Sequence, residues 1–123
     1  MNNFRTLEAV IKRSGALKIE TALPLIRQIL SAVSYLHQNG ICHRDIKPSN
    51  ILIDKGKDLP YLGEAKLSDF GFAVNLTDND KTTSACCVGT EDYMAPEVLG
   101  EHRFSSKSDV WSLGVTFYRM LCG

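Results

Sequence analysis

The chain has 123 residues, 44% of them hydrophobic and 23% charged, with 14 Lys and Arg against 14 Asp and Glu. This composition is that of an ordinary globular domain and excludes a disordered or collagen-like chain. The balanced charge offers no basic face for nucleic acid, and charged residues or proline interrupt every apolar segment that could enter a membrane. Because the first residues also lack the pattern of a signal peptide, we expect one soluble domain in the cytoplasm, with the nucleus as the alternative.

The four cysteines do not have the spacing of a disulfide framework. Cys86 and Cys87 are adjacent, whereas Cys42 and Cys122 stand in apolar runs, where cysteine behaves as a small hydrophobic residue. The three histidines are not spaced as zinc ligands. The sequence therefore predicts structural thiols rather than disulfides or a metal centre.

Apolar residues at helical spacing mark two segments among the first forty residues. In the first segment the apolar positions are Leu7, Val10 and Ile11. The second segment, residues 23–38, is stronger, and its expected buried stripe consists of Leu23, Ile26, Leu30, Val33 and His37. Thr21 is the expected N-cap of this helix, which would place Pro24 in its first turn. Asn39-Gly40 is the expected left-handed stop.

A short β-hairpin is expected after these helices. Residues 51–53 are a short apolar run that suits a strand, and residues 65–68 are its expected partner. The polar segment between them contains glycine and proline. Residues 69–100 show little periodicity and are rich in turn-forming residues. Irregular segments of this length inside a compact domain tend to carry function.

The final segment, residues 109–121, is apolar on every helical face, which predicts a helix buried all round. Ser106 and Asp109 stand before it at the spacing of a capping box.

Three short motifs follow one another along the chain. Residues 43–50 read His-Arg-Asp-Ile-Lys-Pro-Ser-Asn, residues 69–71 read Asp-Phe-Gly, and residues 95–97 read Ala-Pro-Glu. A three-residue match alone is weak evidence, but these three motifs in this order form the signature set of protein kinases. On these residues, the chain resembles a eukaryotic protein kinase of the serine/threonine type.

The resemblance implies a fold that is mostly α with a small β-hairpin, as in the large C-terminal lobe of that family. Residues 1–123 would form a partial domain, from the first helix of that lobe to its central helix. No Gly-x-Gly-x-x-Gly occurs in the chain, and only thirty residues separate Lys12 from His43. Lys12 is therefore not expected to be the ATP-anchoring lysine, and the small ATP-binding lobe and final helices are expected to be absent from this sequence.

The resemblance also implies a reaction, with ATP and Mg²⁺ as cofactors and a Ser or Thr of a protein substrate as acceptor. Asp45 would be the catalytic base, and Lys47 would contact the transferring phosphate, as in serine/threonine kinases. Asn50 and Asp69 would hold the magnesium ion with hard oxygen ligands. Leu52 would lie beneath the adenine ring.

Further positions resemble residues that support the reaction. Thr90 would lie in the substrate-facing loop and bond toward Asp45 and Lys47. Asp109 would hold the backbone of the catalytic loop from below. The other implied structural or regulatory residues are His43, Arg44, Phe70, Gly71 and Glu97.

One expectation concerns regulation. Cys86 occupies the usual phosphate-accepting position of the activation loop. We hypothesise that Thr83 or Ser84 is phosphorylated instead by an upstream activating kinase, with Arg44 as the partner of the phosphate. The alternative is a loop that is ordered without phosphorylation.

Two interpretations of the whole chain stay open. In the first, it is part of a longer, active kinase domain. In the second, it is a catalytically inactive truncated fragment that binds other proteins through the Thr90 region. The presence of Asp45, Lys47, Asn50 and Asp69 together favours the first, since a binding module needs none of them.

Overall fold

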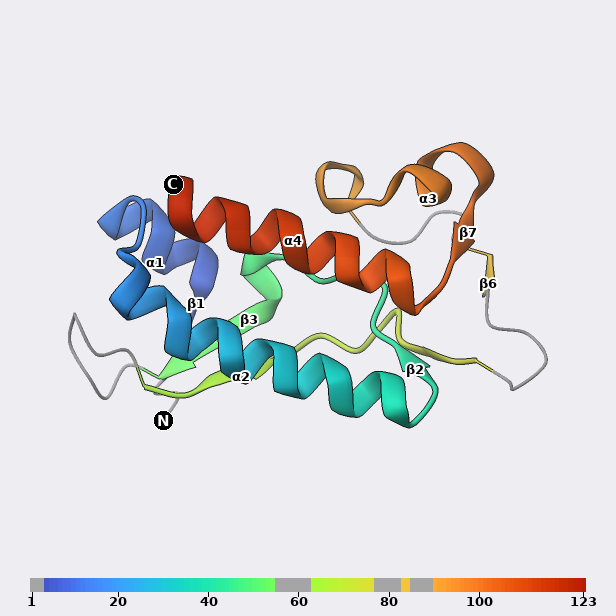
Figure 1. The fold of residues 1–123 in the computed structure, drawn as a ribbon, viewed down its shortest axis with the longest axis horizontal. Coiled ribbons are helices and arrows are strands. Elements are labelled where there is room, and N and C mark those ends of the chain that lie inside the picture. The colour runs from blue at the N-terminus through green and yellow to red at the C-terminus, as the bar shows by residue number, and fades with distance from the viewer. Residues whose placement is uncertain (1–3, 55–62, 77–82, 85–89) are drawn as a thin grey trace.

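The computed structural model describes most of the chain, namely residues 4–54, 63–76, 83–84 and 90–123. The described part is mostly helical, as expected. Its α-helices are α1 (Leu7–Ser14), α2 (Ile19–Gln38), α3 (Pro96–Glu101) and α4 (Ser106–Cys122). Figure 1 shows α2 and α4 side by side and running in opposite directions. Among the helices that the structure describes, none is long and apolar enough to cross a membrane.

The described strands are short and antiparallel. They form a sheet of order β1-β3-β4 and two strand pairs, β2 with β5 and β6 with β7. Their bounds are β1 (Phe4–Thr6), β2 (Ile41–Cys42), β3 (Ile51–Asp54), β4 (Ala65–Leu67), β5 (Val74–Asn75), β6 (Thr83–Ser84) and β7 (Arg103–Phe104). The predicted hairpin is confirmed, with Ile51 opposite Leu67 and Ile53 opposite Ala65. Strands of two or three residues such as β1 carry too little pattern for prediction.

The start of α2 differs from its prediction. The helix begins at Ile19 and has Lys18 as its N-cap, without a side-chain hydrogen bond. The expected cap, Thr21, lies inside the helix and is buried, and Pro24 falls in the second turn. The predicted end is confirmed, because Gly40 has φ +73°, a conformation that glycine adopts at little cost.

The face of α2 that is buried also differs from the predicted stripe. Leu25, Ile29 and Val33 are buried in the main core, whereas Leu23 and Leu30 are 41% and 46% exposed. Apolar residues occupy more than one face of this helix, so periodicity alone could not select the buried one. The selection comes from packing against α4 and β4.

The cap of α4 is displaced by one residue from the predicted pair. Ser105 is the N-cap, and it forms a capping box with Ser108 instead of the expected Ser106 and Asp109. Asp109 is unavailable for capping because its carboxylate accepts hydrogen bonds from the backbone N–H groups of His43 and Arg44.

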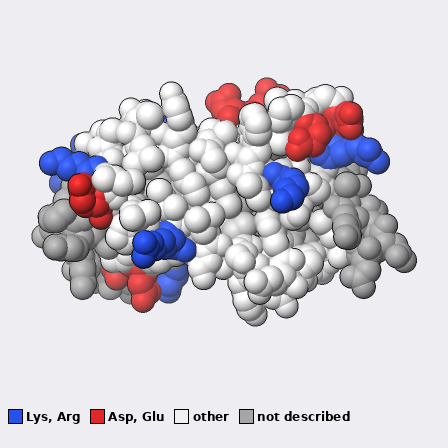
Figure 2. All heavy atoms as spheres, viewed as in Figure 1, with Lys and Arg blue, Asp and Glu red and all other residues white. Residues whose placement is uncertain are grey.

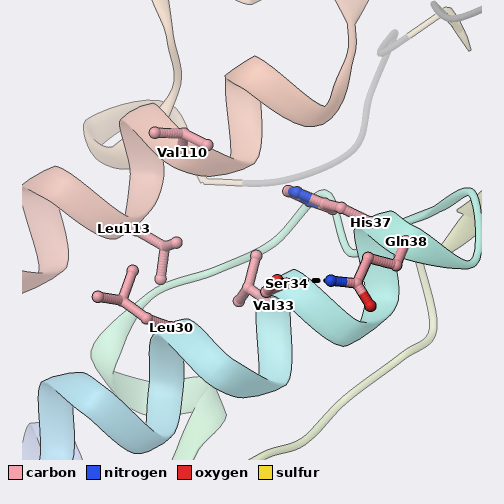
Figure 3. A pocket seen from close by; sticks show the side chains of 7 residues that line it. All are labelled: Leu30, Val33, Ser34, His37, Gln38, Val110 and Leu113. Atoms are coloured by element: carbon pink, nitrogen blue, oxygen red, sulfur yellow. Dashed lines mark hydrogen bonds between the residues drawn. The ribbon is translucent and has the colours of Figure 1, made fainter.

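The prediction that α4 is buried all round is wrong for the described part of the chain. Val110, Trp111 and Tyr118 are 49%, 48% and 71% exposed. Figure 2 shows that uncharged residues cover most of the face formed by α2 and α4, with isolated Lys or Arg side chains among them. A pocket of about 390 Å³ lies between these helices (Figure 3), lined by Leu30, Val33, Ser34, His37, Gln38, Val110 and Leu113.

Candidate active site

The loop between β2 and β3 is held from beneath by Asp109, the fourth residue of α4. This side chain is fully buried, and its Oδ2 and Oδ1 accept the backbone N–H groups of His43 and Arg44 at 2.9 and 3.1 Å. His37, on α2, places its Nε2 2.9 Å from Oδ2. One carboxylate therefore links α2, α4 and the loop that carries the His-Arg-Asp motif.

Two residues of the motifs have a left-handed backbone, which non-glycine residues rarely adopt. Arg44 has φ +72° and Asp69 has φ +57°. The turn at Arg44 occurs where the N–H groups of two successive residues, His43 and Arg44, both donate to the Asp109 carboxylate. Strained backbone of this kind is retained where surrounding contacts hold it, typically at functional sites. Both residues belong to motifs that the sequence singles out, whereas the third such residue in the described part, His102, is the C-cap of α3.

His43 connects the two ends of the candidate site. Its buried ring accepts the N–H of Asp45 at Nδ1, with a distance of 3.1 Å. A neutral ring that accepts at Nδ1 carries its proton on Nε2, which then donates to the Ser68 carbonyl at 2.9 Å. The ring also meets Phe70 edge to face, with centroids 5.0 Å apart. The catalytic loop and the Asp-Phe-Gly segment are thus joined through one imidazole.

Asp45 lies at the centre of a cluster of polar side chains. The Thr90 hydroxyl donates to Asp45 Oδ1 at 3.1 Å and accepts from Lys47 Nζ at 2.7 Å. Lys47 Nζ is itself 3.8 Å from Asp45 Oδ2. Asn50, in the 3₁₀ turn η1 (Pro48–Asn50), donates from Nδ2 to the Asp45 carbonyl and to Oδ2 at 2.7 and 3.1 Å. The structure therefore brings together four residues to which the resemblance assigns catalysis, metal binding and substrate binding.

Asp69 stands just beyond the end of β4 and is exposed. The segment before it is anchored to η1, because the N–H and the hydroxyl of Ser68 both donate to the Asn50 carbonyl, at 2.9 and 3.1 Å. The Asp69 carboxylate accepts the Gly71 N–H at 3.3 Å. Asp69 is thus tethered through Ser68 to the residue that the resemblance pairs with it.

The donor atoms here suit a magnesium ion. Because the Asn50 amide nitrogen is turned toward Asp45, its amide oxygen is the atom left to face a cation. Asp69 adds an exposed carboxylate. Amide and carboxylate oxygens are the ligands that Mg²⁺ takes in nucleotide-binding sites. The side chains of Asn50 and Asp69 therefore fit a magnesium ion.

The remaining predicted positions lie around this cluster. Leu52 is half-buried and points to the opposite side of β3 from the core residues Ile51 and Ile53. Arg44 donates from Nε to the Phe72 carbonyl at 2.6 Å. These positions put Leu52 and the guanidinium of Arg44 outside the main core.

Glu97 and the candidate phosphorylation sites lie farther along the chain. Glu97 accepts a hydrogen bond from the Ser108 hydroxyl at 3.3 Å. Thr83 and Ser84 form β6, whose backbone pairs with β7. Their side chains and Cys86 are outside the described part of the structure.

The structure adds supporting residues that the sequence did not indicate. His37 was expected only as part of an apolar stripe, yet it bonds to a residue 72 positions away. Ser68 was expected only as the end of a strand. Neither residue belongs to a local motif, so their roles depend on contacts that sequence spacing does not report.

His37, Cys42 and Asp109 also bring three metal-ligand atoms within 4.8 Å of one another. Two of these groups are already engaged, since Asp109 bonds to His37 and to backbone N–H groups. Burial, and secondly the charge of Asp109, raise the pKa of the Cys42 thiol to about 12. The chemistry of this trio is therefore that of a hydrogen-bonded support with a protonated thiol.

We expect iodoacetamide near neutral pH to modify the exposed Cys122 and to spare the buried Cys42, because the thiolate is the reactive form. Peptide mapping by mass spectrometry measures both sites, and the urea-unfolded chain is the control in which both react. The raised pKa favours the folded state below about pH 9, and this contribution is lost as the pH rises from about 9 to about 12. Equal labelling of both cysteines in the folded chain would contradict this prediction.

Comparison with known proteins gives a consistent result. The family profile described as "Protein kinase domain" matches residues 1–123. The chain is 43% identical over 113 residues to an Aurora kinase of Schizosaccharomyces pombe, covering 92% of this chain and 29% of that protein. It is 38% identical over 118 residues to the serine/threonine-protein kinase PrkC of Bacillus subtilis, covering 96% of this chain and 17% of that protein.

A third relative is the calcium/calmodulin-dependent protein kinase type 1 of Caenorhabditis briggsae. It is 41% identical over 114 residues, which cover 92% of this chain and 30% of that protein. The chain thus spans less than a third of the length of these three curated relatives.

Proposed function

Because this chain belongs to the protein kinase domain family, we propose that it supplies the catalytic loop for ATP-dependent phosphorylation of Ser or Thr side chains in proteins, as part of a longer kinase domain. One observation carries the proposal. The Thr90 hydroxyl lies between the Asp45 carboxylate and the Lys47 ammonium, at hydrogen-bond distance from both. A hydroxyl acceptor of a protein substrate would need this same pairing of proton acceptor and cation.

Each residue of the cluster then has a chemical task. The acceptor hydroxyl oxygen bonds to the γ-phosphorus of ATP as the bond to ADP breaks, and its proton passes to the carboxylate of Asp45. Lys47 offsets negative charge on the transferring group. Asn50 and Asp69 would hold Mg²⁺, which neutralises charge on the phosphates when it is bound.

Regulation and location complete the proposal. An upstream kinase would phosphorylate Thr83 or Ser84, and Arg44 would pair with the new phosphate, since a guanidinium forms paired hydrogen bonds to phosphate oxygens. The protein would act in the cytoplasm or nucleus on protein substrates. These assignments rest on the resemblance and on the placement of Arg44 beside the Asp-Phe-Gly segment.

The test combines the size of the native protein with its activity. An antibody against residues 54–66 is expected to detect a band well above 13.6 kDa in cell extract. The protein isolated with it is expected to transfer labelled γ-phosphate to peptides in a Mg²⁺-dependent reaction, giving phosphoserine or phosphothreonine. A band at 13.6 kDa without transfer would favour the alternative, an inactive fragment that binds proteins through the Thr90 region. Phosphotyrosine as the main product would overturn the assignment of the acceptor.

A further inference from the structure

The carboxamide of Gln28 joins α2 to the strand that leads to Asp69. Its Oε1 accepts the N–H of Ala65, the first residue of β4, at 2.8 Å. Its Nε2 lies 3.4 Å from the Gly63 carbonyl and 3.3 Å from the Pro24 carbonyl. One half-buried side chain therefore links the middle of the helix to the beginning of the strand.

The contact satisfies a backbone group at the edge of the sheet. β4 is an edge strand in the order β1-β3-β4. Since Asp54 donates its N–H to the Glu64 carbonyl, the next N–H along the strand, that of Ala65, points away from β3. An edge N–H of this kind needs a partner other than a strand. The Gln28 side chain accepts the hydrogen bond that a fourth strand would otherwise accept.

The far end of β4 is held by the site itself. Three residues after Ala65, Ser68 donates twice to the Asn50 carbonyl, and Asp69 follows in its left-handed conformation. A strand of three residues has few ladder bonds, so its placement depends strongly on the contacts at its two ends. At the Ala65 end, Gln28 adds to the ladder bond between Asp54 and Glu64, and Asn50 supplies the contact at the other end.

We propose that Gln28 is a positioning residue, which sets the start of β4 against α2 and thereby places Asp69 beside Asn50. This inference deepens the proposed function, since it concerns the metal-binding pair of that site. Gln28 itself does not touch nucleotide or substrate. It acts through four residues of backbone that end at the metal-binding carboxylate.

The test uses Gln28→Met in the kinase domain that contains this chain. This change keeps the length and packing of the side chain while removing its hydrogen bonds. The matched control is Gln38→Met on the same helix, because the Gln38 amide bonds to Ser34 within that helix. Hydrogen exchange by NMR follows the N–H groups of Ala65 and Ser68, and paramagnetic broadening by Mn²⁺ at the Gly71 N–H gives the affinity of the metal site.

In Gln28→Met we expect exchange about tenfold faster at Ala65 and also at Ser68, as for a local opening of this strand. The Mn²⁺ dissociation constant is expected to rise about tenfold, the low end of the range for residues that support metal ligands. The control should change neither quantity. Faster exchange at Ala65 alone, or an equal increase throughout β3 and α1, would overturn the inference. If the unmodified domain binds no Mn²⁺, the proposed function loses its metal site, whereas exchange at Ser68 still decides the role of Gln28.

Discussion

Replacing Asp109 by Asn is expected to lower the free energy of unfolding by about 3 kcal/mol, which is a large part of the stability of a small domain. The buried carboxylate accepts N–H groups from His43 and Arg44 and meets the ring of His37. An amide keeps one accepting oxygen but turns an NH₂ group toward one of these donors. A buried donor would then face another donor, and both would lack a partner.

Urea denaturation followed by circular dichroism measures this effect. The matched control is Asp92→Asn, the same chemical change at an exposed position in the 3₁₀ turn η2 (Glu91–Tyr93). The control is expected to change the free energy of unfolding by less than about 0.5 kcal/mol, as is usual for surface substitutions. Equal midpoints for the two variants would show that Asp109 does not hold the catalytic loop in the way that its hydrogen bonds indicate.

Replacing Asp45 by Asn in the kinase domain that contains this chain is expected to reduce the rate of phosphoryl transfer about 10²- to 10⁴-fold, the usual contribution of a general base. The amide has nearly the same shape as the carboxylate, but it does not accept the proton of the acceptor hydroxyl. Its oxygen can still accept hydrogen bonds from the neighbouring Asn50 or Thr90. The loss should therefore appear in kcat and leave nucleotide affinity almost unchanged.

Steady-state kinetics with a peptide substrate, together with calorimetric titration of nucleotide, separates these two quantities. Glu101→Gln, at an exposed position at the end of α3, serves as a control that should keep full activity. A variant of Asp45 with near-normal turnover would refute its assignment as the base. An equal loss of nucleotide affinity would instead indicate that the substitution disturbs the whole site.

Local signals in the sequence were sufficient for much of the fold. Helices near residues 7–14 and 23–38, the stop at Gly40 and the pairing of residues 51–53 with residues 65–68 were expected. The structure contains all of them, with the second helix beginning earlier, at Ile19, and the second strand ending at Leu67. Each depends on neighbouring residues, through helical spacing, a left-handed glycine or two short apolar runs. The motif residues were identified in the same way, because their order along the chain is itself the signal.

Residue spacing alone did not indicate the contacts that assemble the site. By its spacing Asp109 was expected to cap a helix, and only the family resemblance placed its carboxylate beneath the His-Arg-Asp loop. The structure shows it accepting N–H groups from residues more than sixty positions away. No pattern in the sequence indicated the contact of Gln28 with the strand. Its partner is the backbone N–H of Ala65, whose orientation depends on strand pairing.

The tertiary structure also decided which helix faces are buried. Leu23 and Leu30 match the helical period as well as the core residues do, and Val110 and Trp111 are large hydrophobic residues, yet all four are exposed. Periodicity reports which residues share a face, but burial depends on which other element packs there. The sequence by itself therefore determined the main helices, the hairpin and the identity of the candidate catalytic residues. Packing between distant segments determined which faces are covered and how those residues meet, since both depend on contacts that no local pattern encodes.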